Sequence, residues 1–222
     1  MQLCDSNFPS GSFSQSFGLE TYLQNEQVID KSSFGRWLMV YLHEQLVYSD
    51  GLGARLIYEA IEQHNLDEVM TLSHQLIVQI LARETREGTL RIGKNMLTMA
   101  TAIYGEQNTL LKQLQEKVKG EKSLVHSATV FAVVAHKLQV DKSTMLQYFL
   151  YATVLGIVQN AVRAIPLGQT QGQLLLHEFQ VEIQKAVEKI MALDAFEFGV
   201  VSLGLELSQM QHERIGIRIF SS

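Results

Sequence analysis

We expect the chain to fold around the stretch Asp141–Gln173, which reads DKSTMLQYFLYATVLGIVQNAVRAIPLGQTQGQ. Asp141 is a good N-cap, because its short carboxylate accepts hydrogen bonds from the free N–H groups of a first helical turn. The residues that follow are apolar on nearly every side, so the helix that they form must be surrounded by other elements. Pro166 cannot continue the helix, and it biases Ile165 away from helical geometry. The stretch therefore predicts a buried central helix that ends just before Pro166.

A cation and a polar turn follow at the end of this helix. Arg163 lies in the last turn, where the negative end of the helix dipole favours a positive charge. After a Leu167-Gly168 turn, the segment 170–173 fits the capping box of a new helix. Spacing alone favours a plain helix–turn–helix connection, but the turn is richer in glutamine and glycine than a connection requires. We predict that this corner binds a partner through charge-assisted hydrogen bonds, with Arg163, Pro166, Gln169 and Gln173 as its contacts.

Composition indicates one acidic globular domain. A chain of 222 residues, 46% of them apolar, is large enough for one domain with its own core. The formal charge of −5 and the lack of a basic stripe argue against a nucleic-acid partner. The single cysteine, Cys4, excludes an intramolecular disulfide and any multi-cysteine zinc site.

The segment Ser143–Val162 has the length of a membrane-spanning helix and carries no charge. Six polar residues are scattered through it, however, which favours a helix buried in a protein core. The first residues show neither the basic region nor the apolar core of a signal peptide. We therefore expect a cytoplasmic protein with no membrane partner.

Apolar residues that recur near the helical period of 3.6 predict further helices around the central one. Asp30 and the serines that follow it offer N-caps for the first of these, and Ser49-Asp50-Gly51 is expected to end it. Without an internal repeat or a linker, residues 1–222 are expected to form a single all-α domain of about ten helices. The segments assigned to these further helices are 34–48, 53–64, 67–83, 108–119, 123–138, 172–193 and 194–211.

The segment Gly88–Asn95 nearly matches the phosphate-binding P-loop, but Asn95 stands where that loop needs a serine or threonine for magnesium. Charged residues precede it, where a P-loop needs a buried strand. The chain has no zinc-protease histidine pair and no nucleophile elbow, and its seven histidines form no cluster. We expect no nucleotide site, catalytic residue, metal site or stably bound cofactor. An enzyme or interaction module with a site built from scattered residues stays open as the alternative.

Both ends of the chain carry apolar anchors. Residues 5–20 read DSNFPSGSFSQSFGLE, and residues 212–222 read HERIGIRIFSS, with isoleucines at a period of two. Ordering each tail residue costs about 1–2 kcal/mol of backbone entropy. Burying each large apolar side chain against a partner returns about 1.5–3 kcal/mol. We therefore expect the tail to be largely mobile in the free protein and to fold on binding.

Four segments together resemble the urease accessory protein F family. They are SGSFSQSFGLE near the start, the Glu84-Thr85-Arg86 signature with Gly93 and Leu97, the segment RAIPLGQTQGQ, and the tail. The tail departs from the family pattern at Gly216-Ile217 and Ser221. The resemblance nevertheless spans nearly the whole chain.

This resemblance implies an all-helical, non-catalytic factor of nickel-dependent urease maturation. Such a factor forms a homodimer and binds accessory protein D, also called H, and the GTPase accessory protein G. The complex docks on apo-urease, and GTP hydrolysis by the partner is coupled to release of nickel, so the complex handles the metal. The expected partner-binding regions are an N-terminal segment (1–20), two internal motifs and the C-terminal tail (212–222). Their contact residues are Phe8, Pro9, Gly11, Phe13, Ser16, Gly18, Glu20, Glu84, Arg86, Arg163, Pro166, Gln169, Gln173, His212, Glu213, Arg214, Arg218 and Phe220.

Overall fold

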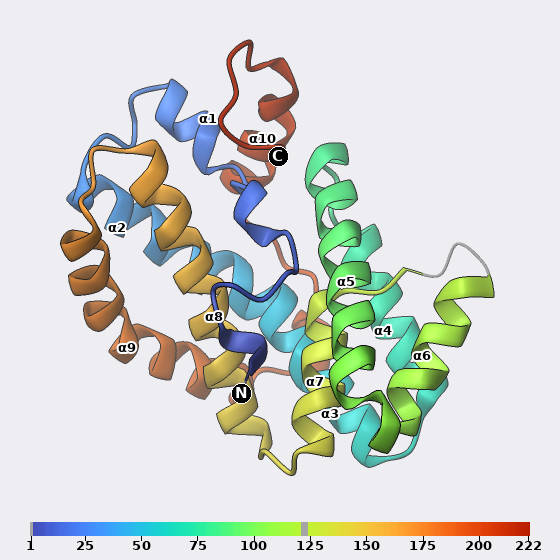
Figure 1. Ribbon diagram of the computed structural model, residues 1–222. Coiled ribbons are helices and arrows are strands. Elements are labelled where there is room, and N and C mark those ends of the chain that lie inside the picture. Colours follow the sequence, from blue (N-terminus) through green and yellow to red (C-terminus); the bar gives the residue numbers. More distant parts are fainter. Residues whose placement is uncertain (1, 121–123) are drawn as a thin grey trace.

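The computed structural model describes residues 2–120 and 124–222, which form helices joined by turns (Figure 1). No β-strand occurs in these two ranges, so the predicted all-α fold is confirmed. A π-helical segment, Tyr41–Gly51, joins α2 to α3. The α-helices are α1 (Leu19–Gln24), α2 (Lys31–Val40), α3 (Leu52–Glu62), α4 (Leu66–Val78), α5 (Arg83–Tyr104), α6 (Thr109–Gly120), α7 (Ser127–Lys137), α8 (Lys142–Ala164), α9 (Gln169–Ala192) and α10 (Leu203–Gln211).

Helix α7 is the most enclosed element. Every residue from Ala128 to Ala135 is buried, because α3, α5, α6 and α8 pack around this helix. The predicted central helix, α8, packs chiefly on α9 and also on α7, α3, the π-helical segment and the N-terminal segment, but its Tyr148 is 42% exposed. The predicted central helix is therefore confirmed as a core helix, although it is not enclosed on every side. Its apolar surface is broader than the elements that cover it, whereas the small side chains of α7 let helices approach from all sides.

Helix α8 is also long and apolar enough to cross a membrane, judged by length and composition alone. Half of its most apolar window is buried inside the fold. Core helices of this kind meet the same criterion, and α8 packs on α9, α7 and α3 as a core helix does.

Local capping signals explain two helix starts and fail at a third. Asp30 accepts a hydrogen bond from the Ser33 N–H at 2.8 Å, and Asp141 accepts one from the Thr144 N–H at 3.0 Å, so both predicted caps are confirmed. Helix α9 begins directly after Gly168 with no side-chain cap, which places Thr170 inside the helix. The predicted capping box over 170–173 was therefore wrong. The connection is shorter than expected, because Leu167 is buried and the helix begins two residues after it.

The predicted helix end at Ser49-Asp50-Gly51 was also wrong. Gly51 has a helical φ of −68°, and α3 follows without interruption. A Cβ at Gly51 would lie 2.5 Å from Ile190 Cδ1 and 2.8 Å from the Leu46 carbonyl oxygen. This glycine therefore allows the π-helical segment to pack closely on α9 instead of ending a helix.

Other helix boundaries shift as well. Helix α4 ends at Val78 rather than near residue 83, and α10 begins at Leu203 rather than near residue 194. Gly199 has a φ of 92°, which interrupts helical geometry before α10. Of the predicted helix over 123–138, Ser123 lies outside the described residues, 124–126 are not helical, and α7 spans Ser127–Lys137 because His126 caps it. Residues Gly88–Asn95 lie within α5, so the near-match to a P-loop forms a helix and no loop.

The two chain ends meet on the same side of the molecule. The N-terminal segment crosses between α8 and α5 and leads into α1, which lies beside α10 (Figure 1). The residues after α10 turn back toward α1 and the first turn of α5 (Figure 1). This arrangement brings the motifs from both ends of the sequence together.

Candidate interaction site

Four segments that are distant in sequence form one assembly, which we call the tail clasp. It consists of residues 13–20, Glu84 in the first turn of α5, Asn160 with Arg163 near the end of α8, and residues 212–222. Hydrogen bonds connect all four segments, including contacts between residues 200 positions apart. Most of the family motifs therefore contact one another inside the protein.

Glu20 is the buried centre of the tail clasp. Its carboxylate accepts hydrogen bonds from the backbone N–H groups of Ile219 and Phe220, the second at 3.0 Å. The Nε2 atom of His212 lies 2.9 Å from the same carboxylate, and both side chains are 0% exposed. A buried carboxylate requires such partners, because an unpaired buried charge is strongly destabilising.

His212 joins two carboxylates. Its Nε2 faces Glu20, and its Nδ1 lies 2.8 Å from Glu84 Oε2. Each ring nitrogen therefore has a carboxylate oxygen within hydrogen-bond distance. Arg218 Nη1 donates to the other Glu84 oxygen at 2.7 Å. Burial acts to raise the pKa of Glu84, but the hydrogen bonds from His212 and Arg218 outweigh it and lower that pKa.

Backbone geometry directs Glu20 inward. Phe17 and Gly18 have φ values of 52° and 90°, so the chain turns sharply just before α1. A Cβ on Gly18 would lie 2.4 Å from Ser208 Oγ, so only glycine allows this approach to α10. The Thr21 hydroxyl donates to the Ser208 carbonyl oxygen at 2.6 Å and stabilises the same close contact between α1 and α10.

Arg163 is part of the tail clasp and does not point to the glutamine-rich turn. Its guanidinium donates to Asn160 Oδ1 at 2.6 Å and to the Phe13 carbonyl oxygen. It also lies over the Phe13 ring at 6.0 Å and the Phe220 ring at 5.3 Å, both within cation–π range. Asn160 Nδ2 donates to the Gln15 carbonyl oxygen at 2.7 Å. The end of α8 thereby holds the N-terminal segment and the tail together.

The tail is packed in the free chain, so the expectation that it is mobile was wrong. The Ser222 carbonyl oxygen accepts from the Ser16 N–H at 2.7 Å, and the Ser221 N–H donates to the Ser14 carbonyl oxygen at 2.7 Å. Phe220 is 5% exposed, whereas Ile217 is 85% exposed. Backbone hydrogen bonds and ion pairs hold the tail in place. The expectation of a mobile tail counted only the burial of its apolar side chains.

The predicted contact residues divide into two groups. Phe13, Ser16, Gly18, Glu20, Glu84, Arg163, His212, Arg218 and Phe220 come together in the tail clasp. Pro166, Gln169 and Gln173 are exposed at the α8–α9 connection, apart from those contacts, and Arg214 is exposed on the tail. Arg86 donates to the carbonyl oxygens of Ile80 and Leu81, just beyond α4, and Glu213 pairs with Arg83 at 3.5 Å.

Three residues of the tail clasp were missed in the sequence. They are Gln15, Asn160 and Ser222. The Asn160 side chain donates to the Gln15 carbonyl oxygen, and the Ser222 hydroxyl donates to Gln15 Oε1. Asn160 did carry a usable signal, because it is an amide in an otherwise apolar helix and lies one turn before Arg163. Ser222 matches the family's C-terminal motif but was not named as a contact, and nothing local distinguishes Gln15 from a surface residue.

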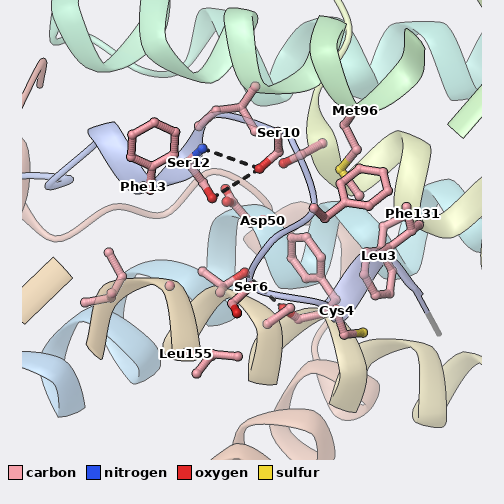
Figure 2. Close-up of a pocket in the computed structure, with 18 of the residues that line it drawn as sticks. Leu3, Cys4, Ser6, Ser10, Ser12, Phe13, Asp50, Met96, Phe131 and Leu155 are labelled. Carbon is pink, nitrogen blue, oxygen red and sulfur yellow. Dashed lines mark hydrogen bonds between the residues drawn. The ribbon is translucent and has the colours of Figure 1, made fainter. Parts of the chain in front are cut away.

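A cavity of about 140 Å³ lies beneath the N-terminal segment, and Phe8, Ser10 and Ser12 line it with side chains from α5, α7 and α8 (Figure 2). Leu3, Met96 and Phe131 gather at one end, whereas Ser10, Ser12 and Asp50 lie toward the other (Figure 2). Pro9 is exposed beside Phe8, Gly11 has a φ of 85°, and Phe13 and Asn160 of the tail clasp also line the pocket.

His126 lies in the wall of this cavity and is 2% exposed. Its Nδ1 accepts the Ala128 N–H at 3.1 Å, and burial lowers its pKa despite Asp50, whose carboxylate is 3.8 Å from Nε2. The ring therefore acts as the N-cap of α7. Within residues 2–120 and 124–222, no three histidine, cysteine or acidic side chains are placed to hold a metal ion together.

The tail clasp presents apolar and cationic groups outward over its polar interior. Phe13 is 65% exposed, Ile219 is 57% exposed, and Arg163 and Arg218 reach solvent. Exposed large apolar side chains beside arginines are typical of protein–protein contact surfaces. The arrangement supports binding of a protein partner.

Comparison with known proteins agrees with the motifs. The model of the UreF family matches residues 28–180. A protein named urease accessory protein UreF from Lachnoclostridium phytofermentans (strain ATCC 700394 / DSM 18823 / ISDg) is 46% identical over 222 residues, which cover 100% of this chain and 96% of the relative. Proteins of the same name from Bacillus sp. (strain TB-90) and Geobacillus kaustophilus (strain HTA426) are 44% and 46% identical, each over 100% of this chain and 96% of the relative.

Proposed function

The chain belongs to the UreF family of urease accessory proteins, and we propose that it is a non-catalytic assembly factor which helps deliver nickel to apo-urease. The resemblance noted in four sequence motifs is confirmed by these matches. In this proposal the chain works in the cytoplasm as a homodimer and holds no stable cofactor. Nickel is the cargo of the complex that it joins.

The proposed partners are accessory protein D, also called H, the GTPase accessory protein G, and apo-urease. The chain bridges the first two and gates the GTP hydrolysis that releases nickel. The observation that carries this proposal is the tail clasp, in which the motif residues of both chain ends are assembled around Glu20 and His212. Such a preformed surface lowers the entropy that binding would otherwise cost.

A deletion strain tests the role in urease maturation. Loss of the gene should abolish urease activity while the urease subunits are still produced, and excess nickel in the medium should restore part of the activity. The matched control is the same strain complemented with the wild-type gene. Unchanged urease activity in the deletion strain would overturn the proposal.

Reconstitution tests the partners. The purified chain should co-purify with accessory protein D/H, and this pair should then retain accessory protein G in the presence of a GTP analogue. Size-exclusion chromatography with light scattering should give twice the 25.0 kDa chain mass for the chain alone. A monomer that retains neither accessory protein would contradict both the bridging role and the dimer.

A further inference from the structure

The cavity beneath the N-terminal segment contains a charged group that the proposed assembly role does not use. Asp50, near the end of the π-helical segment Tyr41–Gly51, lies toward the polar end of this cavity (Figure 2). Its side chain is 27% exposed, so the carboxylate is not sealed inside the core. Turns of π-helix are rare and often occur at functional sites. The carboxylate of Asp50 is therefore a candidate binding group.

Asp50 has no cationic partner among the residues that the structure describes. The Nε2 atom of His126 lies 3.8 Å from its carboxylate, which is beyond hydrogen-bond distance. Burial lowers the pKa of His126, so the ring is neutral, and its proton is on Nε2 because Nδ1 accepts the Ala128 N–H. The start of α7 adds only the partial positive charge of a helix N-terminus. A full negative charge in the cavity wall is thus left without a counter-ion.

Tyr41, at the other end of the π-helical segment, supplies a second polar group without a partner. It lines the cavity and is 4% exposed. Its hydroxyl makes no hydrogen bond to any described residue, and its oxygen is not enclosed, in contrast to Nε1 of Trp37. Burial, with the charge of Asp50 as a second cause, raises the pKa of Tyr41, so the hydroxyl stays neutral. Buried hydroxyl groups nearly always have a partner, so a polar group of a ligand is expected here.

The rest of the lining indicates which kind of cation fits. It includes no lysine or arginine, and its other charged residue, Asp5, is acidic as well. The opposite end is apolar, because Leu3, Met96 and Phe131 gather there (Figure 2). A cavity of about 140 Å³ is close in size to one that holds benzene, a molecule of about six non-hydrogen atoms. The cavity therefore suits a short apolar chain with one positive end.

We propose that this cavity binds a small aliphatic amine in its protonated form. The ammonium group pairs with Asp50 and donates to the Tyr41 hydroxyl oxygen, and the alkyl chain lies toward Leu3 and Met96. Because the N-terminal segment lies over the cavity, the ligand is a free small molecule and not a side chain of a protein partner. The binding is independent of urease maturation and holds whether or not the proposed function is correct.

Ligand-observed NMR on the full chain at neutral pH tests this proposal with pentylamine, pentanol, pentanoate and diaminobutane. Pentylamine should bind saturably. Pentanol has the same length without the charge and should bind about tenfold more weakly, as the loss of a charge-assisted hydrogen bond implies. Pentanoate should bind more weakly still, because its charge is repelled by Asp50. Diaminobutane should also be weaker than pentylamine, because its second charge would lie at the apolar end.

Methyl signals of isotope-labelled methionine locate the bound amine. Met96 lines the apolar end of the cavity, so its signal should shift as pentylamine saturates the chain. Met210, which is 40% exposed on α10 and outside the cavity lining, is the control and should not shift.

The Asp50→Asn variant links binding to the carboxylate. It keeps the shape of the side chain and removes its charge, so pentylamine affinity should fall by at least about tenfold. Glu44→Gln removes the same charge from an exposed position of the same π-helical segment, outside the cavity lining. It is the matched control and should leave the affinity unchanged. Thermal melts by circular dichroism check that each variant folds.

Three binding results would overturn the proposal. They are no saturable binding of pentylamine to the wild-type chain, pentanol or pentanoate affinity equal to that of pentylamine, and equal pentylamine affinity in folded Asp50→Asn and wild type. A Met96 signal that stays in place while pentylamine binds would put the ligand elsewhere and reject this cavity. If Asp50→Asn fails to fold, the comparison of pentylamine with pentanol in the wild type decides together with the Met96 signal.

Discussion

His212 is the residue on which the tail clasp most depends. Its ring lies between Glu20 and Glu84, and removing it leaves a fully buried carboxylate without its side-chain partner. Breaking a buried ion pair from one side costs about 3–5 kcal/mol. We expect His212→Ala to lower the free energy of unfolding by about 3 kcal/mol in a urea titration.

His43 provides the matched control. It faces Glu182 at 3.1 Å, but the two side chains are 20% and 21% exposed, so solvent screens this pair. His43→Ala should cost less than about 1 kcal/mol. Equal losses in the two variants would contradict the central position of His212 in the tail clasp.

Glu84 makes the tail clasp sensitive to acid. Its pKa is lowered in the folded chain, because the hydrogen bonds from His212 and Arg218 outweigh the opposing effect of burial. A lowered carboxyl pKa contributes stability above the unfolded-state pKa of about 4.3, and this stability is lost as the pH falls through the folded-state pKa. The Glu84→Gln variant lacks this carboxyl group, so it lacks the pH-dependent part of the stability.

The free energy of unfolding of the wild type should therefore exceed that of Glu84→Gln at neutral pH. The difference should shrink below about pH 4, where Glu84 becomes protonated. Urea titrations at several pH values measure it. A difference that stays constant down to the acid limit of folding would show that Glu84 contributes through shape and not through charge.

At the scale of elements, glycines set how closely helices pack. Gly93 in α5 faces the segment before α7, and a Cβ there would lie 1.9 Å from the Val125 carbonyl oxygen. Gly93→Ala should lower the free energy of unfolding by about 2–3 kcal/mol, because backbone has to move to make room. The glycine that mimicked a P-loop in the sequence thus has a packing role.

Gly156 in α8 is the control for that substitution. A Cβ at Gly156 would have no atom within 4 Å, so alanine meets open space. Gly156→Ala should raise the free energy of unfolding by about 0.5–1 kcal/mol through helix propensity. Destabilisation of similar size in both variants, measured by denaturant titration, would contradict the packing argument.

At the scale of the whole molecule, the tail belongs to the folded domain. Truncation after Gln211 removes the backbone groups that bond Glu20 and Ser16, together with His212 and the buried Phe220. We expect the truncated chain to melt about 10 °C below the full chain, since about 1 kcal/mol corresponds to 2–4 °C at this size. Equal melting temperatures in calorimetry would support a mobile tail instead.

The outward face of the tail should matter for partners and not for folding. Ile217 and Ile219 are 85% and 57% exposed, so replacing both with serine should change the free energy of unfolding by less than about 0.5 kcal/mol. Co-purification with accessory protein D/H should fall sharply. Ile103→Ser, 41% exposed at the far end of α5, is the control and should bind normally. Normal binding by the double variant would place the partner elsewhere.

Helix content and several helix starts could be predicted from the sequence, because caps and apolar periods act over a few neighbouring residues. Asp30 and Asp141 are examples, and both caps are present. The family motifs also identified Glu20, Glu84, Arg163 and His212 before their contacts were known. They are short and local, so one chain is enough to recognise them.

Only the tertiary structure decided which of these residues meet and which surfaces are buried. Glu20 bonds a backbone group 200 positions away, and no local pattern encodes such a pairing. Burial depends in the same way on which segments cover a helix: α7 is enclosed, whereas half of the most apolar window of α8 is buried. The tail is ordered because a distant carboxylate and an arginine on α8 receive it, and that complementarity exists only once the chain has folded.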